Sequence, residues 1–379
     1  MPKTEGFIAE GYEKVRQAFE QNFTSGQEVG AACCIYRDGK PVVNIWGGLK
    51  NSDTQEAWNE NTVQVIFSAI KGMTTICILS LVEQGKLNLD EPIATYWPEF
   101  AAEGKDVITL SMVLSHRAGV PFIDGDFTLQ DVYDRDSVIE AIARQRPAWE
   151  PGTAHGYHVR TFGWILGEVV RRVTGKSFGE VVQDTISKPL GIPLWVGLPD
   201  SEMDNVAKLI PPPTGSQNLI DLMGADSIMV KAITGPSNLF DYNEMWNTPE
   251  LLRAEMPSSN GVSNAHALAK IYASLLGNGV DNIRLLTEET VKNARQPLSS
   301  GPDSVIVMDT VFGTGFNLPA MLAPVCGENS FGHPGAGGSI AFADPDAGIS
   351  FGYVSNKMRV EPGIEKRTEA ILEATYQSL

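Results

Sequence analysis

The chain has 379 residues, of which 42% are hydrophobic and 20% are charged, and its formal net charge at pH 7 is −17. A chain of this length can bury a large core and is expected to form two lobes. The negative charge argues against nucleic acid and anionic membranes as partners, and it favours small neutral or apolar molecules. An acidic surface that only keeps the protein in solution would give the same composition.

The first segment, residues 1–23, does not combine a basic start with an apolar run, so we expect no secretory signal and a cytoplasmic protein. No apolar stretch of the chain is long enough to span a bilayer. The segment instead predicts an amphipathic helix, because its apolar residues recur at helical spacing: Phe7, Ile8, Tyr12, Val15, Phe19 and Phe23.

Strand patterns occur near both ends of the chain. Residues 30–48 read as two apolar strands joined by an Asp38-Gly39 turn, and residues 338–357 repeat this pattern around a second turn. The closing segment, residues 362–379, is helix-like. Strands at both ends with helical sequence between them predict an α+β fold, in which an antiparallel sheet built from both chain ends is flanked by helices and carries a largely helical inserted domain.

We place the expected domain boundaries accordingly. A sheet domain would comprise residues 1–60 and 265–379, and a mainly helical domain would comprise residues 61–264. Residues 198–259 are rich in Pro, Gly, Asn and Met and are expected to be a loop-rich region of the helical domain. The active site would lie between the two domains.

One stretch combines a serine and a lysine at the start of a buried helix. Residues 68–86, "SAIKGMTTICILSLVEQGK", are apolar on almost every side, with a helix-ending signal at Gly85. Helix N-termini favour developing negative charge at Ser68, and Lys71 would lie one turn further on the same face. Apolar surroundings lower the pKa of a lysine, as a catalytic base requires. Alternatively, Ser68 only caps the helix and Lys71 extends to solvent.

Two further stretches give this pair a context. Tyr157 lies in a loop before a helix, and "FGHPGAGGS" at residues 331–339 is a Gly-rich strand edge whose backbone could approach a ligand closely. With S-x-x-K, their order along the chain resembles the serine β-lactamase and penicillin-binding-protein superfamily. The resemblance is nearest to class C β-lactamases and the related family VIII carboxylesterases. It extends through "VLSHRAGVP", "EPGT" and "GYHVRTFGWILGEVVRRVTGKSF".

The resemblance implies a β-lactamase/transpeptidase-like fold and a role for each matching residue. Ser68 matches the nucleophile, Lys71 its partnering base, and Tyr157 the tyrosine of the Y-x-N element. Residues 333–335, His-Pro-Gly, match the K-T-G element. The oxyanion hole would be the backbone N–H groups of Ser68 and Ala336. Whether Lys71 or Tyr157, held as a phenolate, is the primary base stays open.

Two departures from the class C pattern point to the substrate. Val159 replaces the asparagine of Y-x-N, and His333 replaces the lysine of K-T-G, so an amide and a cation suited to a substrate carboxylate are absent. We therefore expect a serine carboxylesterase that cleaves esters of small, neutral, largely apolar substrates through an acyl-enzyme on Ser68.

Other functions remain as alternatives. A β-lactamase, an amidase or an acyltransferase of the same superfamily would use the same nucleophile, although the expected cytoplasmic location argues against the first. A non-catalytic penicillin-binding-like protein would keep the fold without the chemistry. The sequence does not indicate an oligomeric state.

The remaining candidate residues are weaker. Gly335, Trp149, His158 and the Met- and Phe-rich region from Leu222 to Met256 could line a substrate pocket. His116 is expected to be structural, and His266 to be a surface or capping residue. His155 and His158 have no third metal ligand in sight, and the four cysteines lack metal-ligand spacing and are expected to be free thiols, so we expect no metal and no cofactor.

Overall fold

The structure is a computed structural model that describes residues 3–213, 217–359 and 365–379. Its strands are β1 (Thr4–Ile8), β2 (Gly30–Arg37), β3 (Lys40–Asn51), β4 (Glu56–Ala57), β5 (Gln64–Val65), β6 (Leu194–Trp195), β7 (Val262–Ser263), β8 (Ser299–Pro302), β9 (Asp309–Phe312), β10 (Phe331–Pro334), β11 (Ile340–Asp344) and β12 (Ile349–Ser355).

The α-helices of the described residues connect these strands. They are α1 (Glu13–Thr24), α2 (Ile70–Glu83), α3 (Ile93–Tyr96), α4 (Leu110–Leu114), α5 (Leu129–Asp134), α6 (Asp136–Arg144), α7 (Thr161–Thr174), α8 (Phe178–Val182), α9 (Lys188–Leu190), α10 (Gln217–Met223), α11 (Ile228–Thr234), α12 (Pro249–Arg253), α13 (Ala265–Ala273), α14 (Glu288–Ala294) and α15 (Lys366–Tyr376).

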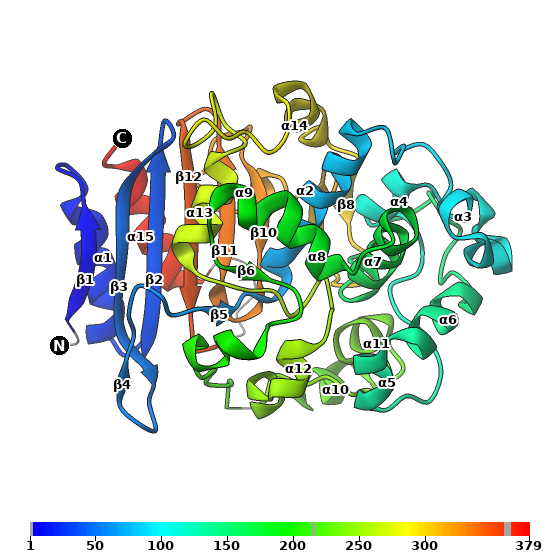
Figure 1. Ribbon diagram of the computed structural model, residues 1–379. Coiled ribbons are helices and arrows are strands. Elements are labelled where there is room, and N and C mark those ends of the chain that lie inside the picture. Colours follow the sequence, from blue (N-terminus) through cyan, green and yellow to red (C-terminus); the bar gives the residue numbers. More distant parts are fainter. Residues whose placement is uncertain (1–2, 214–216, 360–364) are drawn as a thin grey trace.

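The main sheet joins the two ends of the chain. Its strands lie in the order β1-β3-β2-β12-β11-β10, with β4 paired to β3, and every pairing is antiparallel. Cys33 of β2 lies opposite Ile45 of β3 on one side and Tyr353 of β12 on the other. Figure 1 shows the blue and orange strands side by side at this junction. The α+β fold class and the sheet built from both chain ends are thus confirmed.

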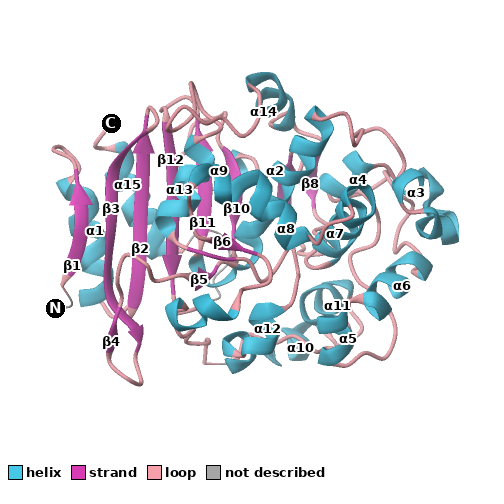
Figure 2. Ribbon diagram, viewed as in Figure 1, coloured by secondary structure: helices cyan, strands magenta, loops and turns pink. Residues whose placement is uncertain are grey.

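The sheet is buried on both faces because its strands are apolar at successive positions. In β2, Ala31, Cys33 and Ile35 pack on the face covered by α1 and α15. The alternate residues of β2 belong to the larger core on the opposite face, against which α13 packs. Strand side chains alternate between the two faces, so a strand that is apolar throughout fits a sheet covered on both sides. Figure 2 shows this layering, with α3, α4, α5, α6, α7 and α11 beyond β10.

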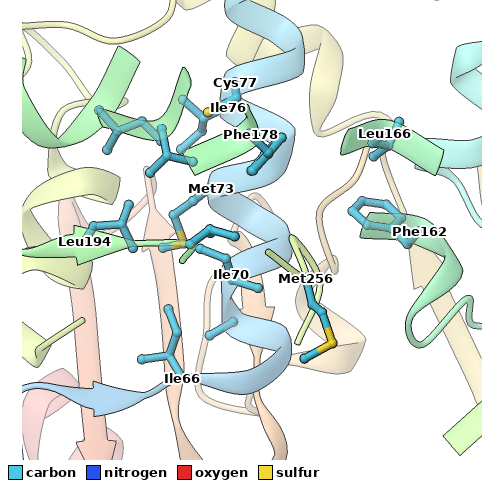
Figure 3. Close-up of a cluster of buried hydrophobic side chains, with 14 of the residues drawn as sticks. Ile66, Ile70, Met73, Ile76, Cys77, Phe162, Leu166, Phe178, Leu194 and Met256 are labelled. Carbon is cyan, nitrogen blue, oxygen red and sulfur yellow. The ribbon is translucent and has the colours of Figure 1, made fainter. Parts of the chain in front are cut away.

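Helix α2 runs through the centre of the remaining core. Every residue from Ile70 to Leu79 is buried, as the apolar pattern predicts. Figure 3 shows side chains of α7, α8 and β6 pointing toward it, among them Phe162, Phe178 and Leu194. The helix ends at Glu83, and Gly85 follows in the left-handed region (φ +69°), which confirms the predicted helix-ending signal. The buried helix gives a rigid base to the residues at its N-terminus.

The prediction for the N-terminal segment was wrong in its first part. Residues Thr4–Ile8 form β1, which pairs with β3, and α1 begins only at Glu13. Gly6 and Gly11 adopt φ values of +99° and +92°, outside the helical region, so the apolar spacing does not continue as one helix. Phe7, counted in the predicted apolar face, is 52% exposed. Pairing with the edge of the sheet outweighs the local helical pattern here.

The middle and end of the chain follow the expectations less closely. The region 198–259 contains α10, α11 and α12 joined by loops, so it is a loop-rich region with short helices. Residues 64–65, 194–195 and 262–263 add a small sheet, β5-β7-β6, to a part of the chain that was expected to be mainly helical. In the closing segment, α15 spans Lys366–Tyr376, and the predicted start at 362–364 lies outside the described residues.

Three negative findings apply to the described ranges. Within residues 3–213, 217–359 and 365–379, no helix is long and apolar enough to cross a membrane. The same ranges contain no group of three or more His, Cys, Asp or Glu residues arranged to hold a metal ion. The thiols of Cys33, Cys34, Cys77 and Cys326 are all free, and the first three are buried.

Candidate active site

Ser68 lies on a tight turn immediately before α2. The turn is the 3-10 segment Phe67–Ala69, and Ser68 is half-buried at its middle. Phe67 has a φ of +46°, an uncommon value for a residue with a large side chain. Its ring packs edge-on against Trp246, with 4.7 Å between centroids, so tertiary packing holds the strained residue in place. Ser68 makes no capping hydrogen bond, and the alternative that it only caps the helix is not observed.

Lys71 is fully buried and does not extend to solvent. Its Nζ atom lies 3.1 Å from Ser68 Oγ, 2.8 Å from the carbonyl oxygen of Val159 and 2.9 Å from that of Ser258. Burial, and secondarily the charge of Arg160, hold the pKa of the Lys71 amine well below its usual value. A neutral amine has two N–H groups and one lone pair. The two carbonyl oxygens are acceptors, so they take up the two N–H groups of a neutral Lys71. Its lone pair then faces the Ser68 hydroxyl.

Tyr157 closes the site from the loop before α7. Its backbone N–H donates to Asp303 Oδ1 (3.1 Å), and its ring stacks on Phe312 with 6.1 Å between centroids. The Lys71 Nζ atom lies 4.9 Å from the centre of the Tyr157 ring. Burial raises the pKa of the Tyr157 hydroxyl, although a hydrogen bond with Ser68 opposes the shift. The phenolate that the sequence left open is therefore not favoured, and the Tyr157 hydroxyl keeps its proton at neutral pH.

The strand end at Gly335 packs directly against the Ser68 turn. A Cβ atom on Gly335 would lie 2.2 Å from the Ile66 carbonyl oxygen and 2.3 Å from Ser339 Oγ. The Ser339 hydroxyl donates to that same Ile66 oxygen at 2.7 Å. Glycine thus allows the backbone before Ala336 to approach the turn that carries Ser68. Among the described residues, no acceptor is recorded for the N–H groups of Ser68 and Ala336, so both could bind an oxyanion.

His333 provides a neutral ring where a class C β-lactamase has lysine. The side chain is buried, and its Nδ1 atom lies 2.6 Å from the carbonyl oxygen of Pro334. Burial lowers the pKa of His333 to about 3. Its Nε2 atom has no hydrogen-bond partner in the described part of the chain. At neutral pH, this position therefore offers no fixed positive charge to a substrate carboxylate.

The other predicted substrate residues differ in their access to the site. The Val159 carbonyl holds Lys71, and its side chain packs with Trp149, which remains half-buried and is suited to a pocket wall. His158 is fully buried: its Nε2 accepts from the Val120 N–H (3.0 Å), and its Nδ1 lies 2.7 Å from the Gly156 oxygen. Since both ring nitrogens are engaged, the expectation that His158 lines the site is not supported.

Two histidines with expected structural roles can be compared. His116 Nδ1 accepts from the backbone N–H of His158 (3.1 Å). Its ring centroid lies 5.0 Å from that of Tyr157, so it packs against the tyrosine ring. His266 was expected to be a surface or capping residue. Asn264 caps α13 instead, and His266 is half-buried with its Nε2 2.9 Å from the Tyr36 hydroxyl oxygen. Its place at the second residue of the helix resembled a cap in the sequence.

A cavity of about 210 Å³ opens beside the oxyanion segment. It is lined by Tyr242, Met308, Met321, residues 334–340, Arg359, Glu365 and Thr368. From the region expected to form pocket walls, Tyr242 lines this cavity. In contrast, Leu222 is 80% exposed and Met256 is buried in the core beside α2, as Figure 3 shows.

Sequence reasoning missed the groups that hold Lys71 and Tyr157. Ser258 contributes only a backbone carbonyl, for which the sequence carries no signal. Asp303 accepts from the N–H groups of Tyr157 and Val305, as acidic residues in tight loops often do. Arg160 is buried beside the site. The sequence did carry one signal for Arg160: an arginine directly before an apolar helix is unusual, because the helix N-terminus disfavours a cation.

The architecture and the comparisons agree on the class of protein. A sheet from both chain ends, a buried central helix preceded by Ser68, and a Gly-rich strand against it define a β-lactamase/transpeptidase-like serine hydrolase. The family model described as Beta-lactamase matches residues 15–376, and the chain therefore belongs to that family.

Individual relatives include both esterases and penicillin-binding homologues. The chain is 32% identical over 354 residues to "Esterase/beta-lactamase LipL" of Mycobacterium tuberculosis, which covers 91% of this chain and 81% of that protein. It is similar over the full length of both chains to the crystal structure of a family VIII carboxylesterase, with 32% identity and a TM-score of 0.87. A penicillin-binding-protein homologue from Caulobacter crescentus matches equally completely, with 34% identity and a TM-score of 0.87.

Proposed function

We propose that this serine hydrolase is a carboxylesterase that cleaves small, neutral, largely apolar esters through an acyl-enzyme on Ser68. The observation that carries the proposal is the environment of Lys71, whose two carbonyl contacts leave its lone pair for the Ser68 hydroxyl. The site would lie between a sheet domain of residues 1–60 and 265–379 and a mainly helical domain of residues 61–264.

Acylation begins when the Ser68 hydroxyl transfers its proton to the neutral Lys71 amine and its oxygen attacks the ester carbonyl. The N–H groups of Ser68 and Ala336 stabilise the resulting oxyanion, and each such donor contributes about 10²–10³ in rate. Tyr157 gives its proton to the departing alkoxide and becomes a phenolate beside the Lys71 ammonium. The products are a free alcohol and the acyl-enzyme.

Deacylation returns every group to its starting state. The Tyr157 phenolate takes a proton from water, and the hydroxide attacks the acyl carbonyl. As the tetrahedral intermediate collapses, Lys71 returns its proton to the Ser68 oxygen and the carboxylic acid leaves. Every step uses protons held by Ser68, Lys71, Tyr157 and water.

The preference for neutral esters is supported by the chemistry of the site walls. His333 carries no charge at neutral pH, and Val159 offers no side-chain amide. The cavity of about 210 Å³ beside Ala336 is bounded by Tyr242, Met308 and Met321, which suits a short apolar acyl or alcohol group. "Carboxylesterase" and "esterase" in the names of similar proteins point the same way.

The test compares four substrates with two proteins. Turnover of p-nitrophenyl acetate, butyrate and octanoate and of a chromogenic cephalosporin is measured for the wild type and for Ser68→Ala. We expect Ser68-dependent cleavage of the two shorter esters, slower cleavage of the octanoate, and little turnover of the cephalosporin.

Each other outcome would favour a named alternative. Fast Ser68-dependent cephalosporin turnover would identify a β-lactamase and contradict the neutral-substrate proposal. Transfer of the acyl group to an added alcohol faster than to water would identify an acyltransferase. If no substrate were turned over and Ser68 were not acylated, the protein would be a non-catalytic relative.

A further inference from the structure

Arg160 is a buried cation in the wall of the candidate site. It directly precedes α7, and its side chain is 5% exposed. Its Nη1 donates to the carbonyl oxygens of Ala232 (3.2 Å) and Ile233, and its guanidinium carbon lies 4.0 Å from the centre of the Phe240 ring. In the part of the chain that the structure describes, its Nε atom has no partner.

Within the part of the chain that the structure describes, the charge of Arg160 has no carboxylate counter-ion. Among residues 3–213, 217–359 and 365–379, no Asp or Glu carboxylate lies within 4.0 Å of its guanidinium. The N-terminus of α7, at which it lies, also disfavours a positive charge. An unpaired buried charge is costly, and a protein that only needed packing at this point would do better with an apolar residue. The position of Arg160 therefore calls for a functional explanation.

Arg160 is built into the structure that holds the Lys71 amine. The residue before it, Val159, supplies one of the two carbonyls that contact Lys71. The other comes from Ser258, whose hydroxyl donates to the carbonyl oxygen of Arg160 at 3.0 Å. Two buried cationic side chains thus share one backbone framework. A guanidinium does not release its proton in proteins. The repulsion between the two buried positive charges is therefore relieved when the Lys71 ammonium loses a proton.

The buried Asp303 accepts from the backbone N–H of Tyr157 and, among the described residues, forms no ion pair with Lys71. The other ionisable side chains that interact with Lys71 itself are neutral at pH 7. They come from the loop before α7, the turn after α4 and strand β10, and comprise Tyr157, His158, His116 and His333. Burial raises the pKa of the tyrosine and lowers the pKa of each histidine. Ser68, on the turn before α2, is also uncharged. Of the described residues whose charge bears on the pKa of Lys71, Arg160 alone remains ionised at neutral pH.

We propose that Arg160 is a positioning residue whose buried charge keeps the Lys71 amine in its neutral, proton-accepting form. Arg160 need not touch the substrate, since it acts through Lys71. The inference rests on the proposed function only in that Lys71 serves as the base for Ser68, and it is independent of which ester is cleaved.

The test follows the reactivity of Ser68 without a physiological substrate. Diethyl p-nitrophenyl phosphate is mixed with the wild type, Arg160→Gln and Arg160→Met from pH 5 to 10. Phosphorylation of Ser68 is followed by p-nitrophenolate release and checked by mass spectrometry. In Arg160→Gln the pH midpoint of the reaction should rise by about one unit, so that the reaction is about tenfold slower below both midpoints and nearly unchanged above them. Arg160→Met, which also removes the charge but has a different shape and no polar group, should raise the midpoint by a similar amount.

The outcomes separate this inference from the proposed function. An equal loss of rate at every pH in Arg160→Gln, or an unshifted midpoint in Arg160→Gln and Arg160→Met, would mean that Arg160 does not act through its charge and would overturn the proposal. If wild type reacted at Ser68 but cleaved no ester, the carboxylesterase proposal would fail while the effect of Arg160 could still be measured.

A second measurement covers the case in which Arg160→Gln does not fold. In the wild type labelled with [ε-¹³C]lysine, the Lys71 signal, assigned by its absence in Lys71→Met, is titrated by NMR. We expect its midpoint well below those of the solvent-exposed lysines. A midpoint in their range would show that Lys71 is protonated at neutral pH and would overturn the proposal.

Discussion

The Lys71 amine lies 3.1 Å from the Ser68 hydroxyl oxygen, and its two other hydrogen-bond partners are both backbone carbonyls. Carbonyls can only accept, so they determine which part of the amine faces the serine once Lys71 is neutral. The pair is thereby arranged for proton transfer from Ser68 to Lys71. This relationship and its surroundings lead to four predictions.

The activity of the wild type should extend far into the alkaline range. Lys71 must be neutral, and its pKa lies well below the usual value, so activity rises with pH through that lowered pKa. Tyr157 must be protonated, and its pKa is raised, so activity should persist to pH 10. The measurement is kcat/KM for phenyl acetate from pH 5 to 10. A rate that was still rising between pH 9 and 10 would indicate an ordinary lysine and contradict the assignment.

Tyr157→Phe should affect poor leaving groups more than good ones. Ethoxide needs the proton that Tyr157 supplies, whereas p-nitrophenolate leaves without one. We expect kcat/KM to fall by about 10³ for ethyl butyrate and by about tenfold for p-nitrophenyl butyrate. Ser68→Ala is the control, because it should abolish both reactions alike. Equal losses for the two esters in Tyr157→Phe would assign Tyr157 a role other than proton donation.

Gly335→Ala should displace the oxyanion segment from Ser68. The φ of Gly335 is −118°, which any residue adopts, so the effect comes only from the added methyl group 2.2 Å from the Ile66 oxygen. We expect about 1–3 kcal/mol of destabilisation and a fall in kcat of about 10²-fold. Thermal unfolding and ester kinetics measure the two effects.

Gly85→Ala is the matched control for that substitution. No atom lies within 4 Å of a Cβ at Gly85, but its φ of +69° is strained for alanine. This variant should lose about 1 kcal/mol of stability and keep its kcat. If both variants lost the same proportion of kcat, the effect at Gly335 would be one of stability alone.

Arg367→Met should weaken both the fold and the oxyanion segment. Arg367 is fully buried, contacts Glu28 (3.0 Å) and Glu365 (2.5 Å), and donates to the carbonyl oxygen of Gly337 at 2.6 Å. Removing it leaves carboxylates without their cation, at a cost of about 3–5 kcal/mol. We expect a lower unfolding temperature and a lower kcat with little change in KM. A reduced stability with unchanged kcat would show that Gly337 does not need this support.

The sequence predicted the main elements where local pattern and tertiary environment agree. The Asp38-Gly39 turn joins β2 to β3 as expected, and the apolar stretch after Ser68 forms the buried α2. The first residues were mispredicted because Phe7 and Ile8 were counted with Tyr12 and the later apolar residues as one helical face. In the structure, Phe7 and Ile8 pair with the edge strand β3 instead. A local sequence pattern carries no information about a sheet edge that residues far along the chain form.

For the candidate site, the sequence identified Ser68, Lys71 and Tyr157 through their residue types and their order. By itself it also determined that His333 and Val159 replace a cation and an amide. It could not decide the protonation states, which depend on the carbonyls of Val159 and Ser258, the burial of Tyr157 and the unpaired charge of Arg160. Those groups are distant in sequence or belong to the backbone, and burial is a property of the assembled core. Only the tertiary structure therefore decided which of the two candidate bases holds a proton.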